Sequence, residues 1–175
     1  MQSHSIPPIV VMGVQGCGKS TIGSLLAKRL GVPFIDGDSL HSVANKHWMA
    51  SGHTLSDAQR LPWLNTVGER LALDAEYGIV VACSALKRSY RDVLREHAPT
   101  MITVFARGDL DLISARIETR RHEYMPPSLL HAQFDDLEER QVDELGVTVD
   151  ITNTPEQIVE HIISAIPEER PVHES

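Results

Sequence analysis

The sequence predicts an α/β fold in which helices cover a parallel sheet, and three observations lead to this prediction. Short apolar runs alternate with helical patterns along the 175 residues, which is typical of strands joined by crossover helices. The first run is rich in β-branched residues, as strands buried on both faces are. The length is that of one domain, and no internal repeat divides it. We therefore expect a single domain over 1–175, with loose termini at 1–8 and 167–175.

The first elements are the clearest. Ile9-Val10-Val11-Met12 is an apolar run that predicts a strand over 9–13. After it, apolar residues recur at helical spacing until Gly31 ends the pattern, which predicts a helix over 19–30. The alternation continues with an expected strand at 33–36, a helix at 56–76 and a strand at 79–83.

The C-terminal half repeats this order. We expect helices at 86–97, 109–120 and 154–165, and strands at 101–106 and 147–151. Ser84 is a candidate N-cap for the first of these helices. Five parallel strands place their carboxyl ends at one edge of the sheet, where ligands of such folds bind.

Charge and composition narrow the classes of function. Lys and Arg number 16 and Asp and Glu number 24, so the net charge is 16 − 24 = −8. Nucleic acid and anionic membranes need basic surface, so we expect neither as a main partner. No apolar run reaches membrane-spanning length, and residues 1–8 lack the features of a secretory signal. Cys17 and Cys83 are expected to be free thiols, which favours a reducing, cytoplasmic location.

Residues 13–20 carry the strongest local signal. They read Gly-Val-Gln-Gly-Cys-Gly-Lys-Ser, which fits the phosphate-binding P-loop pattern, with the expected strand before it and helix after it. Its glycines Gly13, Gly16 and Gly18 let backbone N–H groups point at one anion. Lys19 can reach the outer phosphates of a nucleotide, and the Ser20 hydroxyl can ligate Mg²⁺. The positive N-terminal end of the helix adds to this anion site.

Two carboxylates follow the second strand. Asp36 and Asp38 are two residues apart, so an extended chain would put them on the same side. One can hold Mg²⁺ while the other accepts the hydrogen bond, and the proton, of an acceptor hydroxyl. No Asp ends the third strand, which favours Asp36 for the metal and Asp38 for the hydroxyl, although the two roles could be exchanged. An Asp-Gly-Asp turn that caps a helix is the structural alternative.

Basic side chains follow the later strands. Lys87 and Arg91, and again Arg116 and Arg120, are four residues apart, so each pair shares a helical face. The first pair could bind polar groups of a substrate, and the second could clamp the phosphates of ATP. A solvated basic face and a basic helix C-terminus are the structural alternatives.

Two segments interrupt the alternation at the edge where substrates are expected. We interpret residues 38–64 as a substrate-binding insertion and residues 120–136 as a mobile lid. A lid would exclude water, which must not compete with the acceptor for the phosphoryl group.

These residues together resemble the gluconokinases, a family of P-loop small-molecule kinases close in architecture to shikimate and adenylate kinases. The resemblance covers about residues 9–155 and depends on Asp36-Gly37-Asp38 with His41, on Pro62-Trp63-Leu64, on 83–87 and on a lid pattern that includes Gln133. It implies a three-layer P-loop kinase fold with a five-stranded parallel sheet, a substrate-binding insertion and a lid. The chain departs from the family at Ser42 and Thr54, where proline is usual, and at Gln59, where aspartate is usual. In and after the lid it departs at Glu123-Tyr124, where His-Phe is usual, and at Arg140, where proline is usual.

The resemblance also implies an activity, which is the ATP- and Mg²⁺-dependent phosphorylation of D-gluconate at its 6-hydroxyl by a homodimer. The implied catalytic residues are Lys19, Asp38 and Arg120, and the implied metal ligands are Ser20 and Asp36. The residues implied for gluconate are Asp38, His41, Arg60, Ser84, Lys87 and Arg91. Those implied for ATP are Gly13, Gly16, Cys17, Gly18, Lys19, Ser20, Thr21, Arg116, Arg120, Thr154 and Pro155.

Two other functions remain open from the sequence. One is a shikimate-kinase-like or other small-molecule kinase, although shikimate kinases would have a Gly-Gly pair where this chain has Ser84-Ala85. The other is a nucleotide-binding module without catalysis. Such a module has no need to keep Lys19, Asp36 and Asp38 together.

Overall fold

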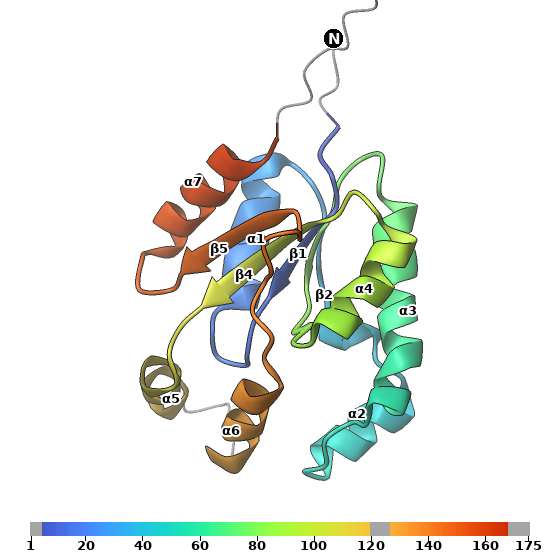
Figure 1. Ribbon diagram of the computed structural model, residues 1–175, viewed down its shortest axis with the longest axis vertical. Helices are drawn as coiled ribbons and strands as arrows, with labels where there is room; N and C mark the ends of the chain where they lie inside the picture. Colours follow the sequence, from blue (N-terminus) through green and yellow to red (C-terminus); the bar gives the residue numbers. More distant parts are fainter. Residues whose placement is uncertain (1–4, 120–126, 168–175) are drawn as a thin grey trace, which may run out of the picture.

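A computed structural model describes residues 5–119 and 127–167, and it contains a five-stranded parallel sheet in the order β2-β3-β1-β4-β5 (Figure 1). The strands are β1 (Ile9–Met12), β2 (Phe34–Asp36), β3 (Val80–Ala82), β4 (Ile102–Arg107) and β5 (Gly146–Asp150). The central strand β1 pairs with both β3 and β4, so that Ile9 stands beside Val80 and Ile102. Because all pairs are parallel, the carboxyl ends of the strands meet at one edge.

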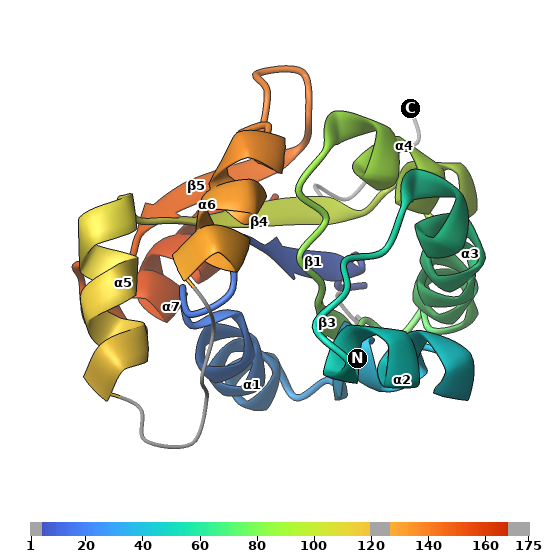
Figure 2. The same cartoon turned by 90° about the horizontal axis from the view of Figure 1, so that it is seen from below.

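The described residues form helices α1 (Lys19–Leu30), α2 (Val43–Ala50), α3 (Asp57–Leu73), α4 (Arg88–His97), α5 (Leu110–Thr119), α6 (Pro127–Asp136) and α7 (Pro155–Ala165), with a 3-10 turn η1 (Gly37–Leu40). Helices α1 and α7 lie on one face of the sheet, and α3 and α4 lie on the other (Figure 1). Figure 2 looks onto the carboxyl edge, with α5 and α6 on one side and α2 on the other.

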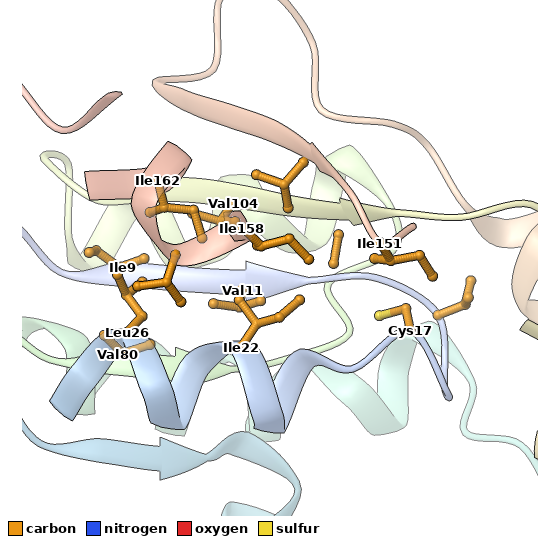
Figure 3. Close-up of a cluster of buried hydrophobic side chains, with 14 of the residues drawn as sticks. Ile9, Val11, Cys17, Ile22, Leu26, Val80, Val104, Ile151, Ile158 and Ile162 are labelled. Atoms are coloured by element: carbon orange, nitrogen blue, oxygen red, sulfur yellow. The ribbon is translucent and has the colours of Figure 1, made fainter. Parts of the chain in front are cut away.

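Alternation along β1 divides the core into two layers. Ile9 and Val11 pack with Ile22 and Leu26 of α1 and with Ile158 of α7, as Figure 3 shows. Val10 and Met12 point the other way, into a cluster with residues of α3 and α4. A strand covered on both faces must be apolar throughout, and all four residues of β1 are buried.

The predicted α/β class and its five-stranded parallel sheet are confirmed. All five strands and the helices expected at 19–30, 56–76, 86–97, 109–120 and 154–165 are present, with ends that differ by up to three residues. The expectation that Ser84 caps α4 is wrong, because α4 begins at Arg88 after Lys87. The predicted loose termini lie mostly outside the described residues.

Helices α2 and α6 were not predicted, because they lie in the two segments interpreted as insertions. No residue of α2 is buried, so α2 lacks the apolar stripe that marks a helix in a sequence. Its N-cap is Ser42, whose hydroxyl accepts from Asn45 N at 3.1 Å. Ser56 and Gln59 form a capping box at the start of α3. Two of the departures from the family pattern, Ser42 and Gln59, therefore serve as helix caps here.

Within 5–119 and 127–167, no helix combines the length and apolar character needed to cross a membrane. Cys17 and Cys83 are both free and buried, which confirms the expectation of free thiols.

Candidate active site

The P-loop connects β1 to α1 at the carboxyl edge of the sheet. Gly16 and Gly18 have φ angles of 85° and 94°, a left-handed conformation that residues with a Cβ rarely adopt. Gly18 is the N-cap of α1, so the free N–H groups of the first helical turn face the loop. The Lys19 ammonium folds back over it and donates to the carbonyls of Gly13 and Val14 at 2.9 and 3.0 Å. The loop thus gathers backbone donors and one cation around a site for an anion.

A hydroxyl and a carboxylate lie together beside the loop. Ser20 Oγ donates to Asp36 Oδ2 at 3.3 Å, which joins the start of α1 to the end of β2. Hydroxyl and carboxylate oxygens are ligands that Mg²⁺ accepts, and they lie at the mouth of a phosphate-binding loop. Ser20 and Asp36 therefore fit a magnesium ion.

Asp36 and Asp38 line the same cleft, but for a different reason from the one expected. Asp38 does not continue the strand; it lies in η1, and Asp36 caps this turn by accepting from Asp38 N at 3.0 Å. The structural alternative of a capping turn is therefore observed, and both carboxylates also lie in the cleft, as the functional prediction requires. The cleft has a volume of about 540 Å³ and also contains Lys19, Ser20 and His41.

The environment of Asp38 suits a proton acceptor. Its carboxylate reaches solvent, yet the walls of the cleft surround it, and this partial desolvation raises its pKa. The negative charge of Asp36 raises the pKa further, and the ammonium of Lys19 opposes both effects. A carboxylate with a raised pKa is a stronger base than an ordinary aspartate.

His41 forms the opposite side of this region. Its ring stacks on Trp63, with centroids 4.1 Å apart, and Trp63 Nε1 donates to the carbonyl of Gly37 at 2.8 Å. Burial lowers the pKa of His41 to about 4, and the charges of Arg60 and Lys46 act in the same direction. The buried Nδ1 of His41 has no partner among the described residues. His41 thus lines the cleft as a neutral imidazole.

We expect this imidazole to make the protein less stable in mild acid. Because the pKa of His41 is about 4 when folded and 6.5 when unfolded, the unfolded chain binds more protons between these values. The free energy of unfolding then falls as the pH drops from 6.5 to 4, by up to about 3 kcal/mol. Urea unfolding at pH 7 and pH 5 measures this fall, and His41→Gln should reduce it, with exposed His47→Gln as the control. Equal falls in His41→Gln and the wild type would contradict the prediction.

Of the other residues expected to bind the substrate, some line the cleft and others do not. Ser84 and Arg60 line the cleft. Lys87 is not among the residues that line the cleft; its ammonium approaches Asp57 at 3.4 Å and stands over the Tyr90 ring. The expectation that Arg91 faces the substrate is wrong. Its guanidinium is fully buried against Glu144, so it cannot reach the cleft.

A second cleft of about 200 Å³ begins on the far side of the P-loop. Cys17 and Thr21 line it, together with Arg116 and Pro155. Arg116 Nη2 donates to the carbonyl of Ile151 at 2.6 Å, which fixes the guanidinium at the cleft wall. Thr154 has a structural task, since its hydroxyl caps α7 by accepting from Gln157 N at 3.2 Å.

The segment interpreted as a lid is described in part. Arg120 lies outside the described residues. Leu129 and Gln133 of α6 line the larger cleft, and Gln133 Oε1 accepts from Gln15 N at 2.7 Å. This contact joins residues 118 positions apart, and no sequence pattern predicts it. The same holds for the stacking of His41 on Trp63 and for the pairing of Arg91 with Glu144.

Comparisons with known proteins identify the family of the chain. A family model described as shikimate kinase matches residues 15–167. A probable gluconokinase of Mus musculus is 38% identical over 90% of this chain and 96% of its own. The thermosensitive gluconokinase of Escherichia coli K12 is 40% identical over 89% of this chain and 87% of its own.

Solved structures lead to the same group. The crystal structure of a gluconokinase from Sinorhizobium meliloti 1021 has a TM-score of 0.86 and 42% identity, over 94% of this chain and 93% of that one. Shikimate kinase from Aquifex aeolicus vf5, with 20% identity and a TM-score of 0.59, shares the fold. From its P-loop, its cleft and these relatives, the chain is a kinase of the gluconokinase family, within the shikimate-kinase-like group of P-loop enzymes.

Proposed function

We propose that the protein transfers the terminal phosphoryl group of ATP to the 6-hydroxyl of D-gluconate, giving 6-phospho-D-gluconate and ADP. The observation that carries the proposal is that one cleft contains both the P-loop and the acceptor residues Asp38, His41 and Arg60. The names of relatives that are 38–40% identical support gluconate as the acceptor.

In this proposal the nucleotide spans the two clefts. Its phosphates lie on the P-loop between Gly13 and Ser20, and its base lies in the smaller cleft near Arg116 and Pro155. Lys19 and the N-terminus of α1 stabilise the charge that spreads over the transferred group. Arg120 is proposed to add a further positive charge from the lid.

Gluconate has two kinds of polar group, a carboxylate and a row of hydroxyls. Arginine matches a carboxylate with two parallel donors, so Arg60 is proposed to bind that end, together with Lys87, which stands over the same Tyr90 ring. The hydroxyls match Asp38, neutral His41 and Ser84, which can all accept hydrogen bonds. Asp38 is proposed to orient the 6-hydroxyl and to take its proton as the bond to phosphorus forms.

Ser20 and Asp36 are proposed to hold Mg²⁺. A magnesium ion at this place would neutralise part of the phosphate charge. The hydroxyl–carboxylate contact of 3.3 Å described above supports this pair over Asp38, which lies farther along the turn.

The lid gives a prediction of its own. We expect ATP and gluconate together, but neither alone, to slow amide hydrogen exchange across residues 120–136, because closure excludes water from the transfer. The contact between Gln133 and Gln15 supports this, since it already links α6 to the P-loop. Exchange measured by mass spectrometry with each ligand alone is the control. Exchange that stays the same with both ligands would contradict a lid.

Two further features complete the proposal. The family resemblance suggests a homodimer, which sedimentation velocity would measure. The free, buried thiols support a cytoplasmic location.

The decisive test is turnover. Purified protein with ATP, Mg²⁺ and gluconate should release ADP and form 6-phosphogluconate, identified by mass spectrometry. A screen of shikimate, other sugar acids and nucleoside monophosphates under the same conditions tests the alternatives. Faster turnover of shikimate than of gluconate would overturn the choice of acceptor, and nucleotide binding without turnover would favour a binding module.

A further inference from the structure

The turn between β3 and α4, residues 83–87, lines the cleft and is hydrogen-bonded to the P-loop. Ser84 lines the cleft, and its carbonyl accepts from Gly13 N at 3.2 Å, which fixes the turn to the first residue of the P-loop. Ala85 has a φ of 42° and, in the described part of the chain, is the non-glycine residue with positive φ. Such a conformation is disfavoured for alanine, so other contacts must hold the turn in place.

Arg91 supplies these contacts from the first part of α4. Its Nη1 donates to the carbonyls of Ala85 and Leu86 at 2.9 and 3.2 Å. Nη2 reaches the carbonyl of Glu139 at 3.3 Å. The guanidinium therefore fastens the turn at two successive carbonyls, that of Ala85 itself and that of the next residue.

Glu144 fixes Arg91 in turn. Its two carboxylate oxygens accept from Nε and Nη2 of Arg91 at 2.7 and 3.0 Å, a two-pronged pair with both side chains 0% exposed. Gln141 N and Arg95 also donate to this carboxylate. Burial alone would raise the pKa of Glu144, but these hydrogen bonds lower it to about 2, so the pair stays charged.

Glu138 also ties the segment after α6 to the same turn. Glu138 N donates to the carbonyl of Leu86 at 2.8 Å, and Glu138 Oε2 accepts from Arg88 N at 3.2 Å. The chain that leaves α6, whose Gln133 contacts the P-loop, is thus held at the turn that carries Ser84. The P-loop and the segment after α6 thus both contact turn 83–87, and the buried ion pair holds this turn.

Stability alone is a weak reason for such a pair. Removing two charges from water is costly, and apolar residues of similar volume are often as stabilising. What apolar residues cannot do is donate to the carbonyls of Ala85 and Leu86. We propose that Arg91 and Glu144 are positioning residues for phosphoryl transfer, which act by fixing turn 83–87 so that Ser84 is held between the acceptor and the P-loop. This inference rests on the proposed function.

The test is the double variant Arg91→Met/Glu144→Met, which removes both buried charges together and so avoids leaving one unpaired. We expect it to fold with a Tm near that of the wild type. Its kcat/KM for gluconate should fall about 100-fold, because small misplacements of binding groups have effects of this size. Hydrogen exchange should rise at residues 83–88 and not in α1 or α3. The Kd for ATP should stay within about threefold, since most P-loop donors are untouched.

The matched control is Arg29→Met/Glu160→Met, which removes an ion pair between α1 and α7 on the exposed surface. It should leave kcat/KM unchanged. If the buried double variant folds and keeps kcat/KM within about threefold of the wild type, the proposal is overturned. If it does not fold, the single variant Arg91→Lys tests the proposal instead. Lysine keeps the charge but cannot reach the carbonyls of Ala85 and Leu86 and also Glu144. Its kcat/KM should fall at least about tenfold with the Kd for ATP preserved, and a smaller fall would equally overturn the proposal.

The wild-type assay separates this inference from the proposed function. If the wild type does not phosphorylate gluconate, the proposed function fails. Exchange at 83–88 and turnover of whichever acceptor the screen finds then test the positioning role in the same variants.

Discussion

Lys19→Ala is expected to lower kcat by about 1,000-fold or more, in line with the loss of a preorganised charge next to the transferred group. The Lys19 ammonium lies over the P-loop, 2.9 Å from the carbonyl of Gly13, so it is held where the outer phosphates are proposed to lie. The effect should appear mainly in kcat, because the charge on the phosphoryl oxygens develops in the transition state. A coupled assay of ADP release at saturating ATP and gluconate measures it.

The matched control is Lys28→Ala, in the last turn of the same helix, where the side chain is exposed and far from the cleft. It should retain the activity of the wild type. Circular dichroism and the Tm of both variants exclude unfolding as the cause. A Lys19→Ala enzyme within about twofold of the wild type would contradict the assignment of this loop as the catalytic phosphate site.

The sequence was informative where a signal is local. Residues 13–20 must wrap an anion, and this requirement fixes the spacing of the glycines and of Lys19. The strands are buried on both faces, so their apolar runs are visible without any knowledge of their partners. For this reason the predicted strands and the helices expected between them agree with the structure to within a few residues.

The sequence failed where a residue's role depends on a distant partner. Arg91 shares a helical face with Lys87, which made it a candidate for the substrate. Its partner Glu144 follows 53 positions later and turns it into the core. The spacing of Asp36 and Asp38 is explained by a 3-10 turn and not by a strand, because Asp36 caps that turn. Helix α2 was not predicted, because none of its residues is buried and its sequence therefore shows no apolar stripe.

The second large effect is expected for Asp38→Asn. Asparagine keeps the shape and can still accept a hydrogen bond, but it cannot take the proton of the acceptor hydroxyl. General-base catalysis contributes about 100- to 10,000-fold, so kcat should fall within this range. The Kd for ATP should hardly change, because Lys19 and the P-loop amides remain in place. Burial and Asp36 raise the pKa of Asp38, so the kcat of the wild type should fall in acid at a higher pH than an ordinary aspartate would give.

Asp36→Asn separates the two carboxylates. If Asp36 serves the metal, its variant should need more Mg²⁺ to reach half of its maximal rate, and Asp38→Asn should not. The opposite pattern would exchange the roles. Asp74→Asn, which changes an aspartate paired with Arg70 at the far end of α3, is the control for the substitution itself. A protein that binds ATP but never turns over in any variant would be a binding module, whereas loss of turnover in Asp38→Asn with ATP binding intact identifies an enzyme. The division of labour between two carboxylates on one turn is therefore the point at which the proposed chemistry can be tested most directly.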